Sequence, residues 1–369
     1  DVTITHVADT GINLNSKDIA GVSSINTGQL ANRNAVQNGA MMVDQRGGTT
    51  TLSGYTKTID RFTAFKSNAG TQTVTQDSEA PVGFKNSLKA VNTVADSSIA
   101  AGDRAAIIYR LEGNDARRFA FGASGAKTVT ISFYVRSSIT GTHGGALGNG
   151  SDNRSYPFTY TISSADTWER KSITIAGDTT GTWATDNARS MQIVWGLGVG
   201  STNSGTAGEW AAADYNSATG ATTNFLTTAN ATWYLTGVQL EEGSTATDFE
   251  HKSIKQEITA CQRYFFSLGG TASYEMIANG MFFNTTTVLM KVDLPVKMRA
   301  GPSITTVNSF LSKVAGANLA TASISVDQAG TQTLSFTATV SGGTSTAGYA
   351  AIMFANNSTD VRFQLSAEL

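Results

Sequence analysis

The chain has 369 residues, of which 15% are charged and 40% hydrophobic, and its formal net charge is −2. A typical globular protein carries about 25% charged residues, so Thr, Ser, Asn, Gln and Gly must cover much of this surface. The hydrophobic content excludes a disordered chain, which combines low hydrophobicity with high net charge. This composition fits a part built into a rigid assembly, and an ordinary all-β surface domain is the alternative.

Several kinds of partner leave no signal in the sequence. Basic residues form no run, so we expect no nucleic acid. No apolar stretch approaches the roughly 20 residues of a bilayer span, so we expect no membrane insertion. The single cysteine, Cys261, excludes an internal disulfide and a multi-cysteine metal site. The first residues do not resemble a signal peptide, and the missing initial Met suggests a fragment of a longer protein.

Residues 1–30 show short apolar alternation interrupted by glycines. This is too little chain to build a core, so we expect an extended arm or shoulder that packs against another subunit or the next domain.

Residues 31–250 alternate between strand and turn patterns. In 128–135, polar and apolar residues alternate with period two, which puts Val129, Ile131 and Phe133 on one face. The same reading gives strands at 171–175, 191–199 and 233–241, with Gly-rich turn clusters between them. Many short strands without a long helical pattern predict an all-β fold, either a sandwich or a jelly roll.

One helix is predicted within 251–265. Ile254, Ile258 and Cys261 fall at positions i, i+4 and i+7, so we expect an apolar stripe packed against the first domain. Ser253 is expected to cap the helix, and Gln256 completes a capping box.

Residues 266–369 return to strand patterns and predict a second, smaller β-sandwich. The candidate strands cover 287–294, 323–326, 334–340, 351–354 and 361–365. No internal repeat of fixed period occurs, so nothing indicates a solenoid.

The sequence offers little catalytic chemistry. The three histidines are far apart, and there is no nucleophile elbow, zinc-binding His pair or phosphate loop. His143 with Ser151 and Asp152 could be drawn as a triad, but polar residues in such Gly-rich loops usually form turns. We therefore expect no enzyme, no catalytic residue, no cofactor and no metal.

A glycosidase needs only two carboxylates, and sequence alone leaves this class open. The closest acidic cluster is Glu241, Glu242 and Asp248. We interpret it as a solvated strand end, with a calcium-binding or catalytic role as the alternative.

Aromatic residues outside the strand patterns are the candidate glycan contacts. Trp195, Trp168 and Trp233 belong to strand patterns and are expected in the core. Trp210 and Tyr215 lie in the polar stretch 201–223, and His143 lies in the connection 141–156. The outer strand faces look flat and rich in Ser and Thr, so we predict a glycan site on these loops. A subunit interface and simple loop packing remain alternatives for Trp210.

Several motifs resemble a β-domain of tail-fibre-like proteins from marine and other bacteriophages. The opening of that domain resembles Ile25–Asn34, Asn38–Met41, Gln45–Gly47, Tyr55 and Ile59–Phe62. Its inner strands are similar to Ile131–Ser137, Thr167–Glu169 and Gly181–Trp183. The most specific match covers Leu235–Glu241, Ala246–Glu250, Glu257–Ile258 and Cys261–Phe265, and Pro295–Pro302 resembles the start of the β-domain that often follows.

This resemblance covers roughly residues 1–302. It implies a jelly roll like that of carbohydrate-binding modules, carried on a virion appendage that is usually trimeric. It transfers no catalytic residue. The motif positions look structural, and Arg263 and Glu241, for example, are expected to form an ion pair or to cap an element within the domain.

The leading hypothesis is therefore a non-enzymatic virion fibre or spike subunit. We expect a homotrimer, located in a tail fibre or a capsid surface appendage, that contacts other virion proteins and host cell-surface polysaccharide. A purely structural capsid or tail decoration protein is the first alternative. A polysaccharide depolymerase is the second, although the repeats of a long parallel β-helix are missing.

Overall fold

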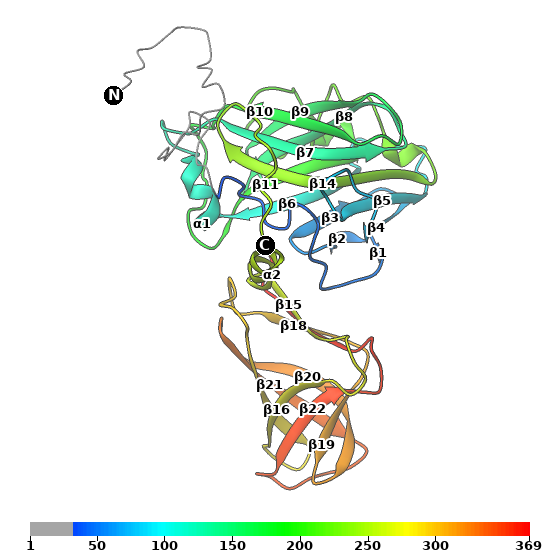
Figure 1. Cartoon of the computed structure of the whole chain (residues 1–369), viewed down its shortest axis with the longest axis vertical. Coiled ribbons are helices and arrows are strands. Elements are labelled where there is room, and N and C mark those ends of the chain that lie inside the picture. The colour runs from blue at the N-terminus through cyan, green and yellow to red at the C-terminus, as the bar shows by residue number, and fades with distance from the viewer. Residues whose placement is uncertain (1–31) are drawn as a thin grey trace, which may run out of the picture.

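The computed structural model describes residues 32–369, so the predicted arm, residues 1–30, lies outside the described residues. A broad upper body continues through one helix into a narrower lower body (Figure 1). Strands are the predominant regular structure of both bodies, which confirms the predicted all-β class. Within residues 32–369, no helix is long and apolar enough to span a membrane.

The upper body is a jelly-roll sandwich of two antiparallel six-stranded sheets. The first sheet has the strand order β1 (Thr50–Thr51), β4 (Thr71–Asp77), β5 (Ser87–Val94), β14 (Ala231–Glu242), β7 (Val129–Ser137) and β10 (Glu169–Ile175). The second sheet has the order β2 (Gly54–Lys57), β3 (Phe62–Lys66), β6 (Arg104–Glu112), β11 (Arg189–Val199), β8 (Gly141–Asn149) and β9 (Ser155–Ile162).

The core of the sandwich lies between the two sheets. Phe133 on β7 meets Trp195 on β11 edge to face, with ring centroids 5.7 Å apart, and Trp233 on β14 is also fully buried. The period-two patterns at 128–135, 171–175, 191–199 and 233–241 correspond to β7, β10, β11 and β14, so these four strand predictions are confirmed. Trp168, which was expected in the core, is only half-buried and packs edge-on against Tyr234.

Short elements connect the strands of the sandwich. They are α1 (Gly113–Ala116), the 3-10 turns at Arg117–Phe119, Ser201–Asn203 and Phe225–Thr227, and the two-residue parallel strands β12 (Ser204–Gly205) and β13 (Ser217–Ala218).

Strand β8 corrects the prediction of a long loop at 141–156. Its glycines serve close packing inside the sheet rather than turns. A Cβ on Gly145 would lie 2.3 Å from the Val194 carbonyl oxygen and 2.6 Å from the Phe158 ring. A Cβ on Gly144 would lie 2.1 Å from the Ser217 hydroxyl. Glycine is therefore the residue that lets this strand pair with both β9 and β11.

The lower body contains a closed β-barrel, whereas the sequence suggested a second β-sandwich. Its barrel has the strand order β16 (Met276–Phe282), β17 (Thr287–Asp293), β21 (Thr333–Ser341), β20 (Ala317–Ala329), β19 (Phe310–Val314) and β22 (Ala350–Ala355). A three-stranded sheet joins it to the upper body and consists of β15 (Phe265–Gly269), β23 (Arg362–Ser366) and β18 (Ser303–Val307).

Two irregularities in the long strand β20 account for the closure. Its register against β21 shifts between Thr321 and Ser323 and again between Val326 and Gln328. Bulges of this kind bend a strand and increase its twist, which lets the edge strands of one sheet meet. In this body β22 pairs with both β16 and β19 and completes the ring.

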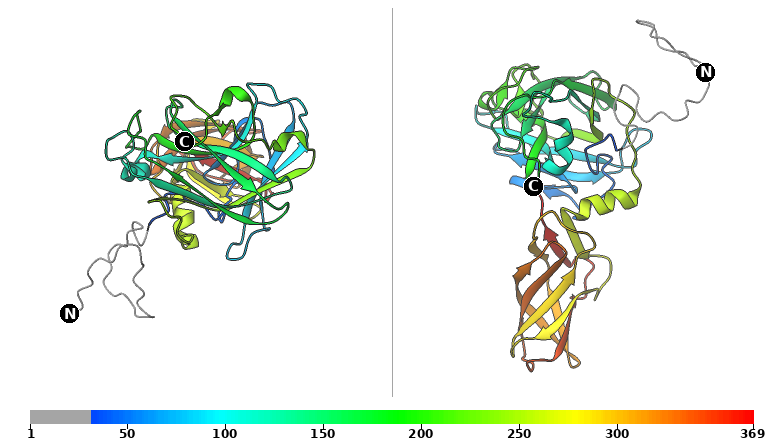
Figure 2. Two further views of the ribbon diagram at one scale, coloured as in Figure 1. Left: turned by 90° about the horizontal axis from the view of Figure 1, so that it is seen from above. Right: turned by 90° about the vertical axis from the view of Figure 1, so that its left-hand side faces the viewer.

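Helix α2 (Ile254–Gln262) lies beside the junction of the two bodies (Figure 2, right). Ser253 and Gln256 form the predicted capping box, which is confirmed. The predicted apolar stripe is wrong, because Ile254 is 48% exposed and Ile258 is 38% exposed. The helix instead buries Glu257 and Cys261, and the Glu257 carboxylate accepts a 2.7 Å hydrogen bond from the backbone N–H of Asn38.

Candidate functional site

His143, a predicted glycan contact, lies on strand β8 and is buried, which corrects its placement on a loop. Its ring stacks on Tyr160 at a centroid distance of 5.5 Å, and its Nε2 lies 3.1 Å from the Ile139 carbonyl oxygen. Burial lowers the pKa of His143. Asp152 bonds to Arg189 and Gln192 instead, so no triad with His143 forms.

Trp210 does lie on a loop, but its ring is packed. It meets Tyr156, Trp183 and Phe121 edge-on at centroid distances of 5.4, 5.6 and 5.8 Å. Its Nε1–H donates to the Ala176 carbonyl oxygen at 2.8 Å. These contacts favour loop packing, which was one of the three readings of this residue, over a free platform for a sugar.

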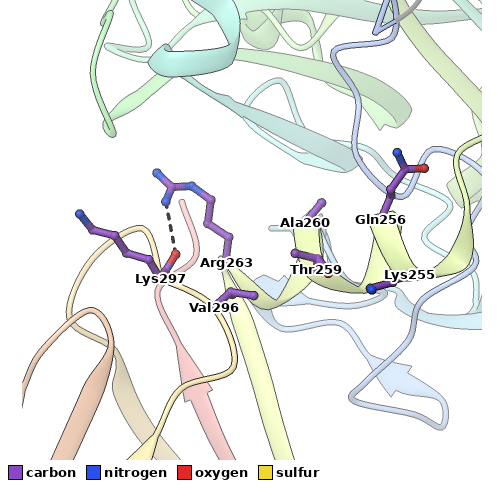
Figure 3. Close-up of a pocket in the computed structure, with 7 residues that line it drawn as sticks. All are labelled: Lys255, Gln256, Thr259, Ala260, Arg263, Val296 and Lys297. Atoms are coloured by element: carbon purple, nitrogen blue, oxygen red, sulfur yellow. Dashed lines mark hydrogen bonds between the residues drawn. The ribbon is translucent and has the colours of Figure 1, made fainter.

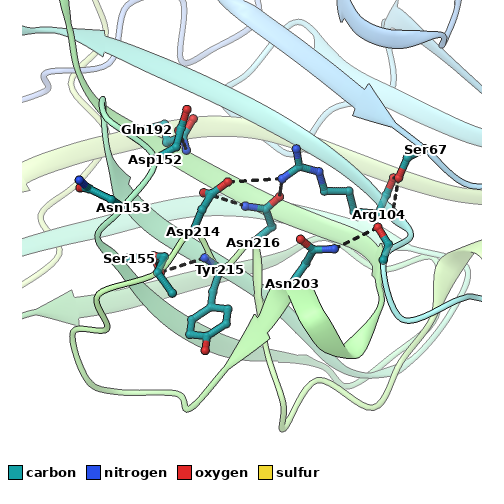
Figure 4. Close-up of polar contacts among 12 residues, drawn as sticks. Ser67, Arg104, Asp152, Asn153, Ser155, Gln192, Asn203, Asp214, Tyr215 and Asn216 are labelled. Carbon is teal, nitrogen blue, oxygen red and sulfur yellow. Dashed lines mark hydrogen bonds and ion pairs between the residues drawn. The ribbon is translucent and has the colours of Figure 1, made fainter.

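Tyr215 lies on the same loop but on the other side of strand β9. Its ring covers Gly205, where a Cβ would come within 2.2 Å of the ring. Its backbone N–H donates to the Ser155 hydroxyl at 3.0 Å. The structure therefore does not bring Tyr215 together with Trp210 or His143, but it places the neighbours Asp214 and Asn216 over the sheet (Figure 4).

The outer face of the β2-β3-β6-β11-β8-β9 sheet has more features than its sequence suggested. Along β6, Ile107 and Tyr109 face the core, while Ala106 and Ile108 face outward and form a small apolar cluster with Val194 and Phe65. Polar and aromatic side chains surround this cluster. We call this surface the outer-face site and define it by Tyr55, Phe65, Arg104, Asp152, Gln192, Asp214 and Asn216.

An aromatic pair with one exposed ring forms one end of the outer-face site. Tyr55 on β2 lies opposite Phe65 on β3, with ring centroids 4.5 Å apart, and Tyr55 is 52% exposed. The Arg104 guanidinium lies 4.3 Å from the Phe65 centroid, and Arg110 lies 5.0 Å from that of Tyr55. Two cations against two rings hold the Tyr55 platform in place while leaving half of it open.

A hydrogen-bonded cluster continues from the aromatic pair across the sheet (Figure 4). Arg104 donates to the Asn216 side-chain oxygen at 2.7 Å and lies 3.5 Å from the Asp214 carboxylate. The Asn216 amide nitrogen in turn donates to Asp214 at 3.3 Å. Asn216 is buried and holds the partly exposed Asp214 carboxylate in place before any ligand arrives, and that carboxylate keeps acceptor positions open.

A second cluster lies beside the first. Gln192 on β11 donates to the Asp152 carboxylate at 3.0 Å, and Arg189 forms an ion pair with the same carboxylate. Burial and the Asp152 carboxylate raise the pKa of Asp214, although the Arg104 guanidinium opposes this shift. The two carboxylates therefore lie close enough to influence each other, and each has its own arginine.

Sequence reasoning missed this site because it excluded strand faces. Tyr55 belonged to the family motif but was not selected as a contact. The segment that forms β6 contains Ala105–Tyr109, five apolar residues in succession, and such a run shows no period-two pattern. Arg104 and Arg110 flank this run and are an even number of positions apart, so their side chains point to the same face of the strand. This spacing was the available signal that one face of β6 is polar at both ends.

The predicted acidic cluster is part of the fold. Glu241 is buried rather than solvated, and its carboxylate accepts hydrogen bonds from the Thr247 backbone at 2.9 Å and the Thr247 hydroxyl at 2.6 Å. Glu242 forms an ion pair with Lys127. Within residues 32–369, no group of three His, Cys, Asp or Glu side chains is arranged to hold a metal ion.

A hollow of about 480 Å3 lies between α2 and residues 296–297 (Figure 3). Lys255, Arg263 and Lys297 line it together with the stems of Gln256, Thr259, Ala260 and Val296. Arg263 is already bonded to Glu112 and to the Lys297 carbonyl oxygen. The hollow contains no aromatic ring, so it offers a sugar less than the outer-face site does.

No family model and no curated protein sequence matches the chain. Among solved structures, a protein of Bacteroides thetaiotaomicron is similar over 57% of this chain and all of its own length, at 8% identity and a TM-score of 0.34. The enzymatically active domain of tailspike protein 4 from bacteriophage CBA120 is similar over 57% of this chain and 21% of its own, at 10% identity and a TM-score of 0.30.

A family 11 carbohydrate-binding module from Clostridium thermocellum, in complex with a β-1,3-1,4-mixed-linked tetrasaccharide, is similar over 56% of this chain and all of its own. Its identity is 10% and its TM-score 0.27. The jelly-roll assignment rests on the strand order and register of the two sheets described above.

Proposed function

We propose that this protein is a non-enzymatic virion fibre or spike subunit whose jelly-roll domain binds host-surface glycans at the outer-face site. The observation that carries the proposal is the half-exposed Tyr55 ring beside preorganised amide, carboxylate and guanidinium groups. An aromatic face attracts the C–H face of a sugar ring, because the ring's electron-rich face meets weakly positive hydrogens. The partly exposed Asp214 and Asp152 carboxylates can then accept hydrogen bonds from the hydroxyl groups, while the buried Asn216 and Gln192 hold them in place.

One half-exposed ring supplies the stacking surface of the proposed site, so single-site binding should be weak. A single sugar ring stacked on Tyr55 contributes only about 1–2 kcal/mol, and the expected dissociation constant lies around millimolar to high micromolar. Presentation of three sites on a homotrimer, and of many fibres on one particle, would raise the apparent affinity by avidity. The proposal therefore includes a homotrimer and a location on the virion.

The state of the two carboxylates favours binding over hydrolysis. A glycosidase needs one carboxyl group free to donate a proton and a second one free to act as base or nucleophile. Asp152 is paired with Arg189, and Asp214 lies beside Arg104. Arg189 and Gln192 both bond the Asp152 carboxylate, so it is not free to act as the base or nucleophile that would have to work with Asp214.

A binding assay combined with an assay for reducing ends tests this proposal. The full chain is incubated with a panel of purified bacterial capsular polysaccharides and O-antigens, and bound polymer and released reducing ends are both measured. Binding without release supports the proposal. Steady release that Asp214→Asn abolishes would move the protein to the depolymerase class. No binding to any polymer, with the protein still present on particles, would favour a decoration protein.

A further inference from the structure

The barrel of the lower body exposes large apolar side chains on its outside. Tyr274, Met276, Met281, Phe283 and Ile352 are each between 41% and 72% exposed. The barrel core is filled by other residues of the same strands, among them Phe282, Val288, Met290 and Met353. The exposed side chains are therefore additional to the core, although the Tyr274 ring meets Phe354 edge-on at a centroid distance of 6.0 Å.

Strand register places these side chains on the outer face of β16 and its two neighbours, with the exposed Asn279 between Met276 and Met281. Met276 on β16 pairs with Phe354 on β22, Asn279 pairs with Ile352, and Met281 pairs with Leu289 on β17. We call this surface the barrel face and define it by Tyr274, Met276, Met281, Phe283, Leu289, Ile352 and Phe354. It includes a hollow of about 400 Å3 lined by Tyr274, Met276, Ile352 and Phe354 together with Lys313 and Asn318.

The size of the barrel face is close to what a stable interface requires. With about 150–250 Å2 for each aromatic side chain, its members expose on the order of 600 Å2. The largest apolar patch on a typical monomer is about 300–600 Å2, and each partner of a standard interface buries about 800 Å2. The barrel face therefore lies at the upper limit for a free surface and supplies most of one interface.

We propose that a second copy of this chain covers the barrel face. Residues 266–369 carry five basic side chains (Lys291, Lys297, Arg299, Lys313 and Arg362) and five acidic side chains (Glu275, Asp293, Asp327, Asp360 and Glu368). Two copies of the lower body therefore meet without net repulsion. A strongly charged partner, such as nucleic acid or an acidic protein, would find no charge bias to match.

The register also shows which charges border the barrel face. Lys313 pairs with Ile352 across β19 and β22, and Lys291 pairs with Asn279 across β17 and β16. Lys291 is neutralised by Asp293 at 2.8 Å. Lys313 also lines the hollow of the barrel face, so the face is apolar with few charges, as the central part of an interface between subunits usually is.

The test compares the association of the full chain with that of two variants by sedimentation velocity across a concentration series. Met276→Asp/Ile352→Asp places two charges in the centre of the barrel face. Val326→Asp is the matched control, because Val326 is 43% exposed on β20, three strands from β16 in either direction around the barrel. We expect wild type and Val326→Asp to self-associate at micromolar concentration, and the double variant to dissociate at least about 100-fold more readily.

Two results would overturn this proposal. One is a wild-type chain that stays monomeric up to about 100 μM, well above the dissociation constants of specific subunit interfaces. The other is a double variant that associates as wild type does, which would place the contact elsewhere. Circular dichroism and thermal unfolding establish that the variants are folded. This proposal rests on the homotrimer of the proposed function and names its contact. Glycan binding is measured separately and per site, so a loss of glycan binding and a loss of self-association are distinguishable.

Discussion

Arg263, next to the end of α2, holds the Glu112 carboxylate at the end of β6 through hydrogen bonds of 2.6 and 3.0 Å. The Tyr264 hydroxyl donates to the same carboxylate at 2.7 Å, and the Glu112 side chain is almost fully buried. Sequence reasoning paired or capped Arg263 and Glu241 within the domain, but Glu241 is bonded to Thr247. The Arg263–Glu112 pair instead fixes the junction of the two bodies to the sandwich.

Replacing Glu112 with Gln should lower the free energy of unfolding by about 2–4 kcal/mol at pH 7, because it leaves a partly buried guanidinium without its counter-charge. Urea or thermal unfolding measures the change. Asp293→Asn, in the exposed Lys291–Asp293 pair, is the control and should cost no more than about 0.5 kcal/mol. An equal effect of the two variants would contradict the structural importance of this pair.

The loss in Glu112→Gln should also depend on pH. Burial alone would raise the pKa of Glu112, but the hydrogen bonds from Arg263, Asn114 and Tyr264 outweigh it and lower the pKa. A lowered folded-state pKa contributes stability above the unfolded value of about 4.3, and this contribution is lost as pH falls through the folded value. The difference between wild type and variant should therefore shrink below about pH 4.

Ile258→Asp should change the free energy of unfolding by no more than about 0.5–1 kcal/mol, because Ile258 is on the exposed side of α2. Cys261→Asp, one turn further along on the buried side, should cost several kcal/mol, since it places a charge in a fully buried position. Chemical denaturation of both variants makes the comparison. A large loss for Ile258→Asp with little change for Cys261→Asp would show that the helix is rotated.

Asp60→Asn should remove a pH dependence that the wild-type protein shows. Asp60 is fully buried, and burial raises its pKa to about 6 against the lowering by Arg46 and by hydrogen bonds from Gln45. A raised folded-state pKa stabilises the fold below the unfolded value of about 3.9, and this contribution is lost as pH rises through the folded value. Between pH 4 and 7, wild type should lose about 2–3 kcal/mol relative to the variant.

Denaturant unfolding of both proteins at the two pH values gives this difference directly. A constant difference between wild type and Asp60→Asn would contradict the raised pKa. A constant offset by itself is expected from the hydrogen bond that Gln45 loses, so only the change with pH is diagnostic.

Gly145→Ala should destabilise the sandwich by several kcal/mol or prevent its folding, because a Cβ at this position overlaps the Val194 carbonyl oxygen. Gly125→Ala is the matched control, since a Cβ there meets no atom within 4 Å. Its effect on thermal unfolding should be small. If both variants fold with wild-type stability, β8 is not packed as described.

Local sequence patterns predicted those parts of the fold that depend on one exposed and one buried face. Strands β7 and β10 followed from period-two alternation, and the cap of α2 followed from Ser253 and Gln256. Strand β8 could not be recognised, because its glycines are required partly by Val194 on β11 and Ser217 on β13, which are distant in sequence. Ile254 and Ile258 are exposed, although the spacing of apolar residues within the helix predicts them to be core residues. That spacing carries no information about which side of the helix the sandwich covers.

The candidate site was beyond sequence reasoning for a similar reason. The outer-face site combines Tyr55 from β2, Arg104 from β6 and Asp214 from a loop that crosses the sheet. Only the sheet order brings these three together, and no spacing in the chain encodes that order. Trp210, which did stand out in the sequence, contributes to the packing of the loop.

The most direct test of the glycan-binding claim is the per-site dissociation constant of Tyr55→Ala for a polysaccharide that the wild-type chain binds. Tyr349→Ala is the matched control, because Tyr349 is a tyrosine of nearly equal exposure in the lower body (51% against 52%). Removing a stacked ring should weaken binding about 5- to 30-fold, or 1–2 kcal/mol. We predict this loss for Tyr55→Ala and wild-type binding for Tyr349→Ala, whereas unchanged binding by Tyr55→Ala would contradict the outer-face site.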